Sequence, residues 1–187
     1  SIHTHSTANT PPVFTLRDRN GKVIRTLKDN AALRETMAEH GAVEKDFFTF
    51  TNDAGVELNC WKMLPQDFDP AKKYPVYVAI YGGPGANTVT DSWGGSTFLW
   101  QQYLAQEGYI VVSCDPRGTQ FRGREFEHST YRELGKLETV DFIDLAEHLG
   151  TWDFVDADRI GIQGDPIHLF ADATHSDVFR GHHAFGL

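Results

Sequence analysis

The stretch "YPVYVAIYGGPG", residues 74–85, decides the fold class of this chain. Its solid apolar run ends in glycines, a pattern typical of a strand that is buried on both faces of a sheet. The same pattern returns in "YIVVSCDPRG", residues 109–118, and in "DRIGIQG", residues 158–164. We therefore predict three parallel strands at the centre of one sheet.

Amphipathic segments separate these three runs. "TFLWQQYLAQEG", residues 97–108, and "LETVDFIDLAEHLGTW", residues 137–152, both space their apolar residues as helices do. The predicted inward-facing residues are Phe98, Leu99, Tyr103 and Leu104 in the first helix, and Val140, Ile143, Leu145 and Leu149 in the second. Alternation of strands and helices predicts an α/β fold, with a mainly parallel sheet and helices on both of its faces.

Two hairpins are predicted before this unit. Val13–Leu16 and Val23–Leu27 flank a polar turn in which Asn20-Gly21 supplies the positive backbone dihedrals of a tight hairpin. "DFFTFTN", residues 46–52, and "VELNCWKMLP", residues 56–65, form the second pair.

A short amphipathic helix is predicted between the two hairpins, in "DNAALRETMAEHG", residues 29–41. We expect Asn30 as its N-cap and Gly41 as its stop, with Leu33 and Met37 one turn apart. The helix serves as a connector, so we place a domain boundary between residues 28 and 45.

Composition narrows the functional classes. The chain has 187 residues, of which 40% are apolar, enough to bury a core. A net charge of -9 without any basic stripe argues against a nucleic-acid partner, and no apolar stretch is long enough to cross a bilayer. Cys60 and Cys114 lie in apolar runs and are interpreted as small buried hydrophobes rather than as a disulfide or a zinc site.

Three loops follow the predicted parallel strands, at residues 81–85, 115–123 and 164–168. Ligands of α/β sheets bind at this edge. In the first loop, the Tyr81 hydroxyl could donate a hydrogen bond to a developing oxyanion. Alternatively, Tyr81 has no catalytic role and its ring packs beneath the loop. In the second, we expect Asp115 to cap a turn, and Arg117 and Arg122 to pair with carboxylates.

The third loop departs from a hydrolase motif. Many α/β-hydrolases place a serine in G-x-S-x-G where a strand turns into a helix, but this chain has G-D-P-I-H at residues 164–168. Pro166 stands at the serine position and has neither a hydroxyl nor an N–H group.

Several of these segments together resemble one family. "YPVYVAIYGGPG", "WQQYLAQEGYIVVSCDPRGT", "FRGREFEHSTYRELGKLETVDFIDLAEHL" and "FVDADRIGIQG" are similar, in order, to the catalytic domain of prolyl oligopeptidase family serine peptidases, especially the dipeptidyl peptidase IV branch. "HSTANTPPVFTLRDRNGKVIRTLKDN" resembles the end of the β-propeller of that family. The resemblance runs from about Thr7 to Gly164.

The resemblance implies a β-propeller that gates an α/β-hydrolase domain and a protein that releases N-terminal dipeptides from peptides. It divides this chain into the end of the propeller at residues 1–30, a helical connector at 31–45 and the N-terminal part of the peptidase domain at 46–187. It implies a peptide substrate, no cofactor and an extracytoplasmic location. It leaves open whether the longer parent protein is a homodimer.

Residue by residue, the resemblance assigns Tyr81 to the oxyanion hole and Gly164 to the start of the nucleophile elbow, G-W-S-Y-G-G. Here Pro166 replaces the serine and His168 replaces a glycine. The chain ends at Leu187, before the catalytic Asp and His of the family. We therefore expect an incomplete sheet, a marginally stable domain and no peptidase activity of this chain alone.

Two other functions compete with an inert peptidase fragment. His168, Asp172 and His175 fall at i, i+4 and i+7, so a helical segment could hold zinc, although chance histidines on a solvated end are the favoured interpretation. A non-catalytic binding protein on a hydrolase scaffold ranks below the fragment, because such a protein is expected to keep the whole sheet.

Overall fold

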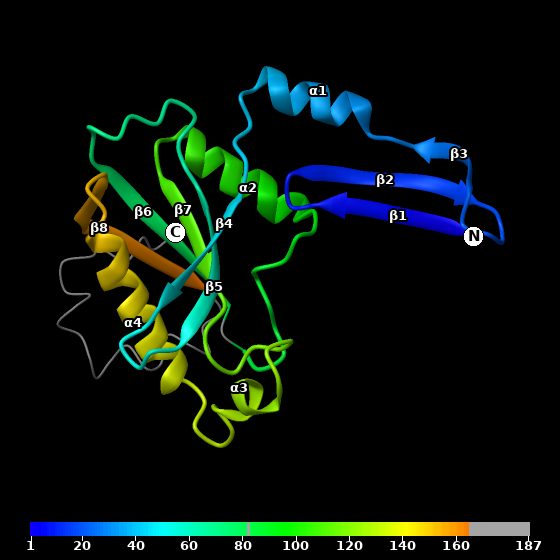
Figure 1. Ribbon diagram of the computed structural model, residues 1–187. Coiled ribbons are helices and arrows are strands. Elements are labelled where there is room, and N and C mark those ends of the chain that lie inside the picture. The colour runs from blue at the N-terminus through cyan, green and yellow to red at the C-terminus, as the bar shows by residue number, and fades with distance from the viewer. Residues whose placement is uncertain (82, 165–187) are drawn as a thin grey trace.

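Two β-sheets form the framework of the molecule (Figure 1). The computed structural model describes residues 1–81 and 83–164. The small sheet has three strands in the order β1-β2-β3, and the large sheet has five in the order β4-β5-β7-β6-β8. The strands are β1 (Ile2–Thr7), β2 (Thr10–Arg17), β3 (Val23–Lys28), β4 (Asp46–Thr51), β5 (Glu57–Met63), β6 (Tyr74–Ile80), β7 (Ile110–Cys114) and β8 (Val155–Gly164).

The small sheet contains the first predicted hairpin, as β2 and β3. Its turn is held by Asp18, whose carboxylate accepts hydrogen bonds from the N–H groups of Asn20 (2.8 Å) and Lys22 (2.9 Å). Gly21 takes the positive φ of 83° that the turn requires. Strand β1, which pairs antiparallel with β2, was not predicted, because its sequence, IHTHST, is mostly polar and has little apolar alternation.

Helix α1 (Ala31–Glu39) forms where the connector was predicted, and Asn30 is its N-cap residue as expected, although the Asn30 side chain makes no capping hydrogen bond. Asn30 adopts a left-handed φ of 53° and directs its side-chain amide to the Pro12 carbonyl at 2.7 Å. The Asp29 carboxylate instead accepts a hydrogen bond from the Ala31 N–H group, the first of the helix, at 3.1 Å. Gly41 follows the helix with a φ of 65°, as expected of a stop.

The large sheet is mixed rather than mainly parallel. Strand β6 pairs parallel with β7 and with β8, as predicted, and β4 and β5 form the predicted second hairpin. Strand β5 also pairs antiparallel with β7. The prediction missed this pairing because β5 and β7 are separated in sequence by β6 and a helix, and periodicity carries no information on such contacts.

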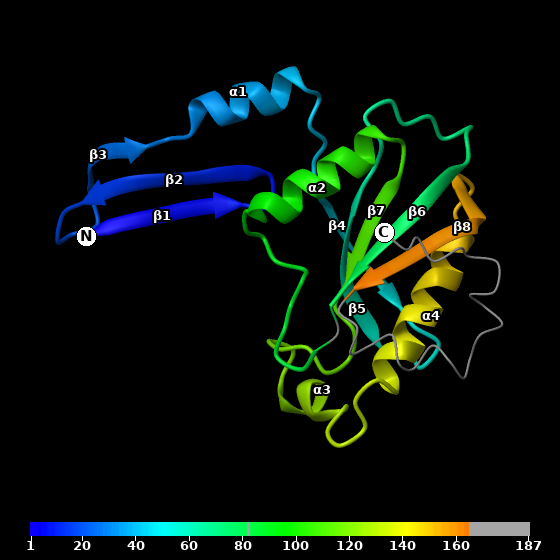
Figure 2. The same cartoon turned by 180° about the vertical axis from the view of Figure 1, so that it is seen from behind.

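Helices cover both faces of the large sheet, as predicted (Figures 1 and 2). Helix α4 (Leu137–Gly150) packs on one face with a core centred on buried Leu145 and Leu149. Helix α2 (Gly95–Gln106) packs on the other face, where Phe98 contacts the cluster around Trp61. Helix α3 (Arg124–His128) is a single short turn.

The predicted inward faces of these helices were partly wrong. Leu99 (50% exposed), Tyr103 (51%) and Val140 (41%) lie on the surface. The buried stripe of α2 includes Gln102 instead, since its side-chain amide accepts from the Val43 N–H group at 2.8 Å and donates to the Val43 carbonyl at 2.6 Å. A glutamine that satisfies a backbone segment can be buried without penalty, so hydropathy alone misplaces the stripe.

The two cysteines form a disulfide, contrary to the sequence interpretation. Both are buried, as expected, but Cys60 of β5 and Cys114 of β7 are direct partners in the antiparallel register and are bonded to each other. The pairing depends on the unpredicted β5–β7 contact, which explains why the sequence did not reveal it.

Polar contacts join the small sheet to the rest of the molecule. Asn9, in the turn between β1 and β2, donates its side-chain amide to the Lys45 carbonyl at 3.0 Å and accepts from the Lys45 N–H group at 2.7 Å. The neighbouring Ala8 N–H group donates to the Asp91 carboxylate at 2.8 Å. The Lys45 ammonium lies 4.1 Å from the centre of the Trp61 ring, and burial lowers the pKa of this lysine to about 8.

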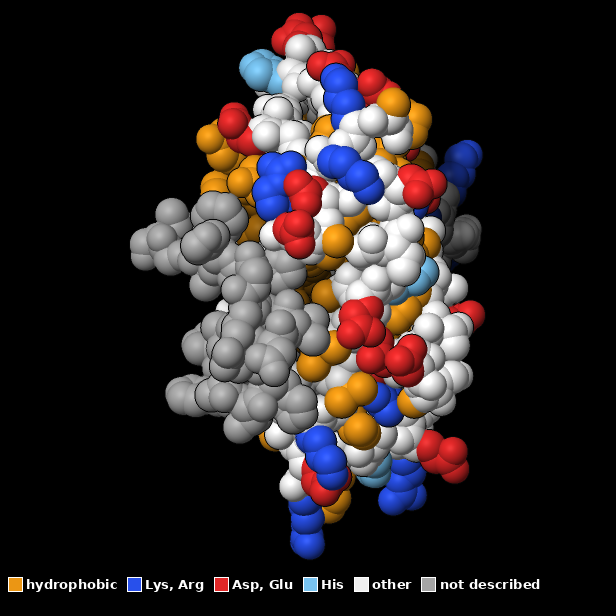
Figure 3. Space-filling view, turned by 90° about the vertical axis from the view of Figure 1, so that its left-hand side faces the viewer, with side chains coloured by type: hydrophobic (Ala, Val, Ile, Leu, Met, Phe, Trp, Pro, Cys, Tyr) orange, Lys and Arg blue, Asp and Glu red, His pale blue; other side chains and the backbone are white. Residues whose placement is uncertain are grey.

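Charges of both signs are mixed on one face of the molecule (Figure 3). Figure 3, which shows the side of the molecule at the left of Figure 1, has Lys and Arg side chains interspersed with Asp and Glu. Across residues 1–81 and 83–164, no helix is both long enough and apolar enough to span a membrane.

Candidate functional site

Three strand ends meet at one edge of the large sheet. Because β6 lies parallel between β7 and β8, the carboxyl ends of these three strands lie on the same side of the sheet. Ile80 is the register partner of Gly164, the last residue of β8. A Cβ atom at Gly164 would collide with the Ile80 side chain and carbonyl, so this close approach requires glycine.

Tyr81 is the first residue after β6, and its side chain is 43% exposed. The ring lies beside Gly83, where an added Cβ atom would be 3.2 Å from the Tyr81 Cε1 atom. The tyrosine side chain is therefore open to solvent at the edge where α/β sheets bind ligands. Its role as an oxyanion donor stays a prediction.

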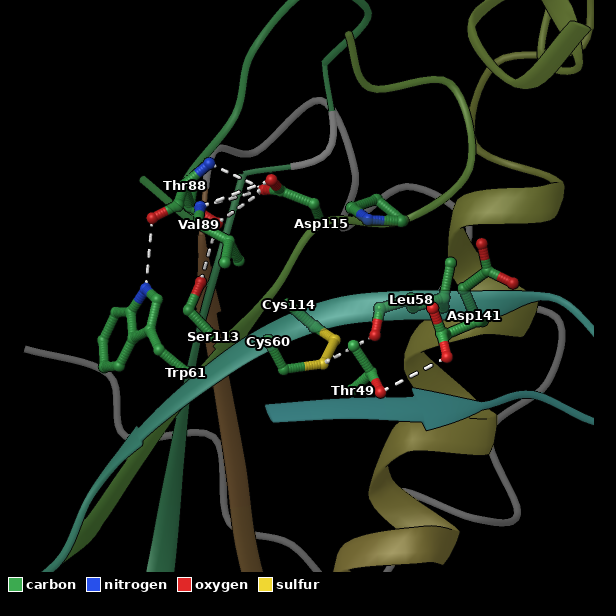
Figure 4. Close-up of a disulfide and its surroundings, with 12 residues drawn as sticks. Thr49, Leu58, Cys60, Trp61, Thr88, Val89, Ser113, Cys114, Asp115 and Asp141 are labelled. Atoms are coloured by element: carbon green, nitrogen blue, oxygen red, sulfur yellow. Dashed lines mark hydrogen bonds between the residues drawn. A yellow bond between two sulfur atoms is a disulfide. The ribbon is translucent and has the colours of Figure 1, made fainter. Parts of the chain in front are cut away.

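Asp115, the first residue after β7, holds the loop that begins at Tyr81 (Figure 4). Its buried carboxylate accepts hydrogen bonds from the Thr88 N–H group (2.7 Å), the Thr88 hydroxyl (3.0 Å), the Val89 N–H group (3.3 Å) and the Asn87 amide (2.8 Å). Asp115 therefore accepts backbone N–H groups as a capping residue does, but those groups belong to the loop after β6. A carboxylate that accepts several N–H groups fixes the path of the backbone that supplies them.

Further contacts tie the same loop to the sheet. The Thr88 carbonyl accepts from the Trp61 indole N–H group at 3.1 Å, and the Thr88 hydroxyl lies 2.8 Å from that of Ser113 (Figure 4). Asn87 also binds the backbone of Gln120, accepting from its N–H group at 3.2 Å and donating to its carbonyl at 3.3 Å. The loops after β6 and β7 thus form one bonded unit.

Arg117 is anchored to helix α4, as the sequence predicted for an arginine paired with a carboxylate. Its Nη2 and Nε atoms lie 2.7 and 2.9 Å from Asp141 Oδ1, and its N–H group donates to Asp141 Oδ2 at 2.7 Å. The Asn52 amide donates to Asp141 Oδ1 at 2.7 Å. Arg122 differs from the prediction, because it donates to the Glu57 backbone carbonyl at 2.6 Å.

Replacement of Asp115 by alanine is expected to lower the free energy of unfolding by about 2 kcal/mol, because it leaves several partly buried donors of residues 87–89 without their acceptor. Urea denaturation followed by circular dichroism measures this loss. Asp115→Asn is the matched control, since it keeps one acceptor oxygen, and it should cost less than the alanine variant. Equal stability of Asp115→Ala and the wild-type chain would contradict this account.

The remaining predicted site residues lie outside the described part of the chain. These are Pro166, at the predicted nucleophile position, and the predicted metal ligands His168, Asp172 and His175. Within residues 1–81 and 83–164, no group of three or more His, Cys, Asp or Glu side chains is arranged to hold a metal ion.

Comparisons with known proteins identify relatives of this chain. Residues 96–165 match the model of the prolyl oligopeptidase family. The chain is 38% identical over 146 residues to a probable dipeptidyl peptidase 4 of Aspergillus flavus, covering 76% of this chain and 19% of that protein. It is 32% identical over 178 residues to dipeptidyl peptidase 4 of Arthroderma otae, covering 94% of this chain and 23% of that protein.

Solved structures give the same relationship. The crystal structure of Porphyromonas gingivalis dipeptidyl peptidase 4 superposes with a TM-score of 0.83 at 40% identity, over 91% of this chain and 24% of that one. Pyrococcus horikoshii acylaminoacyl peptidase superposes with a TM-score of 0.74 at 25% identity, over 95% of this chain and 28% of that one.

The chain spans about a fifth of the length of the curated relatives it matches. Its family match, its dipeptidyl peptidase 4 relatives and its structural neighbour agree with one another. The chain therefore belongs to the prolyl oligopeptidase family of peptidases, in its dipeptidyl peptidase IV branch.

Proposed function

We propose that this chain is part of the catalytic domain of a dipeptidyl peptidase that acts on peptides, and that in its present form it does not cleave them by itself. One observation carries the proposal: in the parallel register of β6 and β8, Ile80, which precedes Tyr81, pairs with Gly164, the last residue of β8. A family hydrolase needs an oxyanion donor and a nucleophile at this edge. The small sheet then corresponds to the end of a β-propeller.

Tyr81 and Pro166 differ in what their side chains could contribute to catalysis. The Tyr81 hydroxyl is a donor that could stabilise the negative charge on the carbonyl oxygen of a peptide under attack. Pro166 offers no hydroxyl, so no acyl-enzyme can form at that position. We therefore expect this chain to bind peptides although it does not cleave them.

The proposal is tested by incubating the purified chain with a Gly-Pro chromogenic substrate. We expect no initial burst and no turnover above that of a heat-unfolded sample. Turnover that persists through repurification and stops with an active-site serine reagent would show that this chain does cleave peptides.

Sequencing the coding DNA across codons 160–187 tests the substitution itself. We expect it to encode G-D-P-I-H in frame. An intact G-W-S-Y-G-G motif in another reading frame would instead mean that the protein carries the serine, and the proposed inactivity would then be wrong.

A further inference from the structure

Phe121, in the loop after β7, combines full exposure with an unfavourable backbone. Its side chain is 89% exposed, more than any other large hydrophobic side chain in the described residues. Its φ of 71° lies in the left-handed region, where a bulky side chain crowds the following carbonyl. Glycine at this position would remove the strain and the exposed ring, so the fold gives no reason for phenylalanine.

The backbone on both sides of Phe121 is fixed. Gln120 is held through its N–H group and its carbonyl by the Asn87 side chain. Arg122 donates to the Glu57 carbonyl at 2.6 Å, and its guanidinium lies 4.6 Å from the centre of the Phe126 ring. These anchors hold Phe121 in its strained conformation and prevent the loop from relaxing to bury the ring.

The anchors also place Phe121 beside the loop that starts at Tyr81. Asn87 belongs to that loop, as does Gly85, where an added Cβ atom would lie 2.9 Å from the Gln120 side-chain nitrogen. The exposed ring is thus attached to the same strand-end edge as Tyr81. A residue with a strained backbone, which its neighbours fix at the edge of the sheet where ligands bind, indicates a functional constraint.

We propose that Phe121 is a specificity-determining residue that contacts an apolar side chain of a peptide bound at this edge. The inference rests on the proposed function, since it takes the ligand to be a peptide. An aromatic side chain with only two rotatable bonds, carried on a fixed backbone, gains contact area with an apolar group and loses little conformational entropy on binding. The strain at Phe121 is then retained for binding rather than for folding.

The test compares two tripeptides, Gly-Pro-Phe and Gly-Pro-Gly, by ligand-observed NMR titration of the wild-type chain and of Phe121→Gly. The wild-type chain is expected to bind Gly-Pro-Phe about fivefold more tightly than Gly-Pro-Gly. Phe121→Gly should bind both tripeptides equally. The same substitution should raise the melting temperature by about 2 °C, because it releases backbone strain.

Arg132→Gly is the matched control, since Arg132 is the other exposed non-glycine residue of this region with a positive φ, 65°. It should leave the tripeptide preference unchanged. A preference for Gly-Pro-Phe that survives in Phe121→Gly would overturn the inference but leave the peptide site standing. A lower melting temperature of Phe121→Gly would also overturn it, because the ring would then be structural. Binding of neither tripeptide to the wild-type chain would overturn the proposed function itself.

Discussion

Replacement of Asp141 by alanine is expected to lower the free energy of unfolding by about 3–5 kcal/mol, because it leaves a largely buried guanidinium without its carboxylate. Asp141 is 1% exposed and receives the Arg117 side chain, the Arg117 N–H group and the Asn52 amide. It therefore joins helix α4 to the loop after β7 and to the turn after β4. Typical domains are stable by only 5–15 kcal/mol, so the variant should lose much of its folded population.

Urea denaturation of Asp141→Ala, followed by tryptophan fluorescence, measures the loss. Asp156→Ala is the matched control, because Asp156 also pairs with an arginine, Arg159 at 2.6 Å, but on the surface. This control should change stability little, since exposed ion pairs contribute little. If the two variants were equally stable, the network around Asp141 would not hold the loop in the way that its hydrogen bonds suggest.

Reduction of the Cys60–Cys114 disulfide is expected to lower the free energy of unfolding by about 4 kcal/mol. The two cysteines are 54 residues apart, and a crosslink over a loop of that length removes much conformational entropy from the unfolded chain. Urea denaturation with and without dithiothreitol measures the difference.

A double variant, Cys60→Ala with Cys114→Ala, separates the crosslink from other effects of the reductant. It should unfold at the same urea concentration in both conditions, close to that of the reduced wild-type chain. Alkylation of both cysteines in unfolded, unreduced protein would show that the disulfide is absent and would remove the basis of this prediction.

The sequence was most informative where structure is local. The apolar runs that end at Tyr81, Asp115 and Gly164 predicted the parallel strands, and Asn20-Gly21 predicted a hairpin turn. Short-range periodicity and turn chemistry decide such elements. The N-cap position of α1 was also predicted correctly at Asn30, but the side chain that bonds the start of the helix is that of the adjacent Asp29, which is an equally good acceptor.

The candidate site depends on contacts between distant segments, and here the sequence could predict less. Tyr81 and the pairing of Arg117 with a carboxylate were predicted, but Asp141 lies 24 residues beyond Arg117 and was not identified as the partner. Nor did the sequence indicate that Asp115 would hold residues 87–89. Such pairings are set by the packing of strands and helices, which no local pattern encodes.

The loop after Tyr81 is fastened to both parts of the molecule. At residues 87–89 it is bonded to Asp115, directly after β7 of the large sheet, and two residues later Asp91 is bonded to Ala8, in the turn between β1 and β2 of the small sheet. The intervening backbone is too short to absorb a large displacement between the two sheets. Any rotation of the small sheet would therefore displace this segment. The loop thus couples the orientation of the small sheet to the position of the backbone that carries Tyr81.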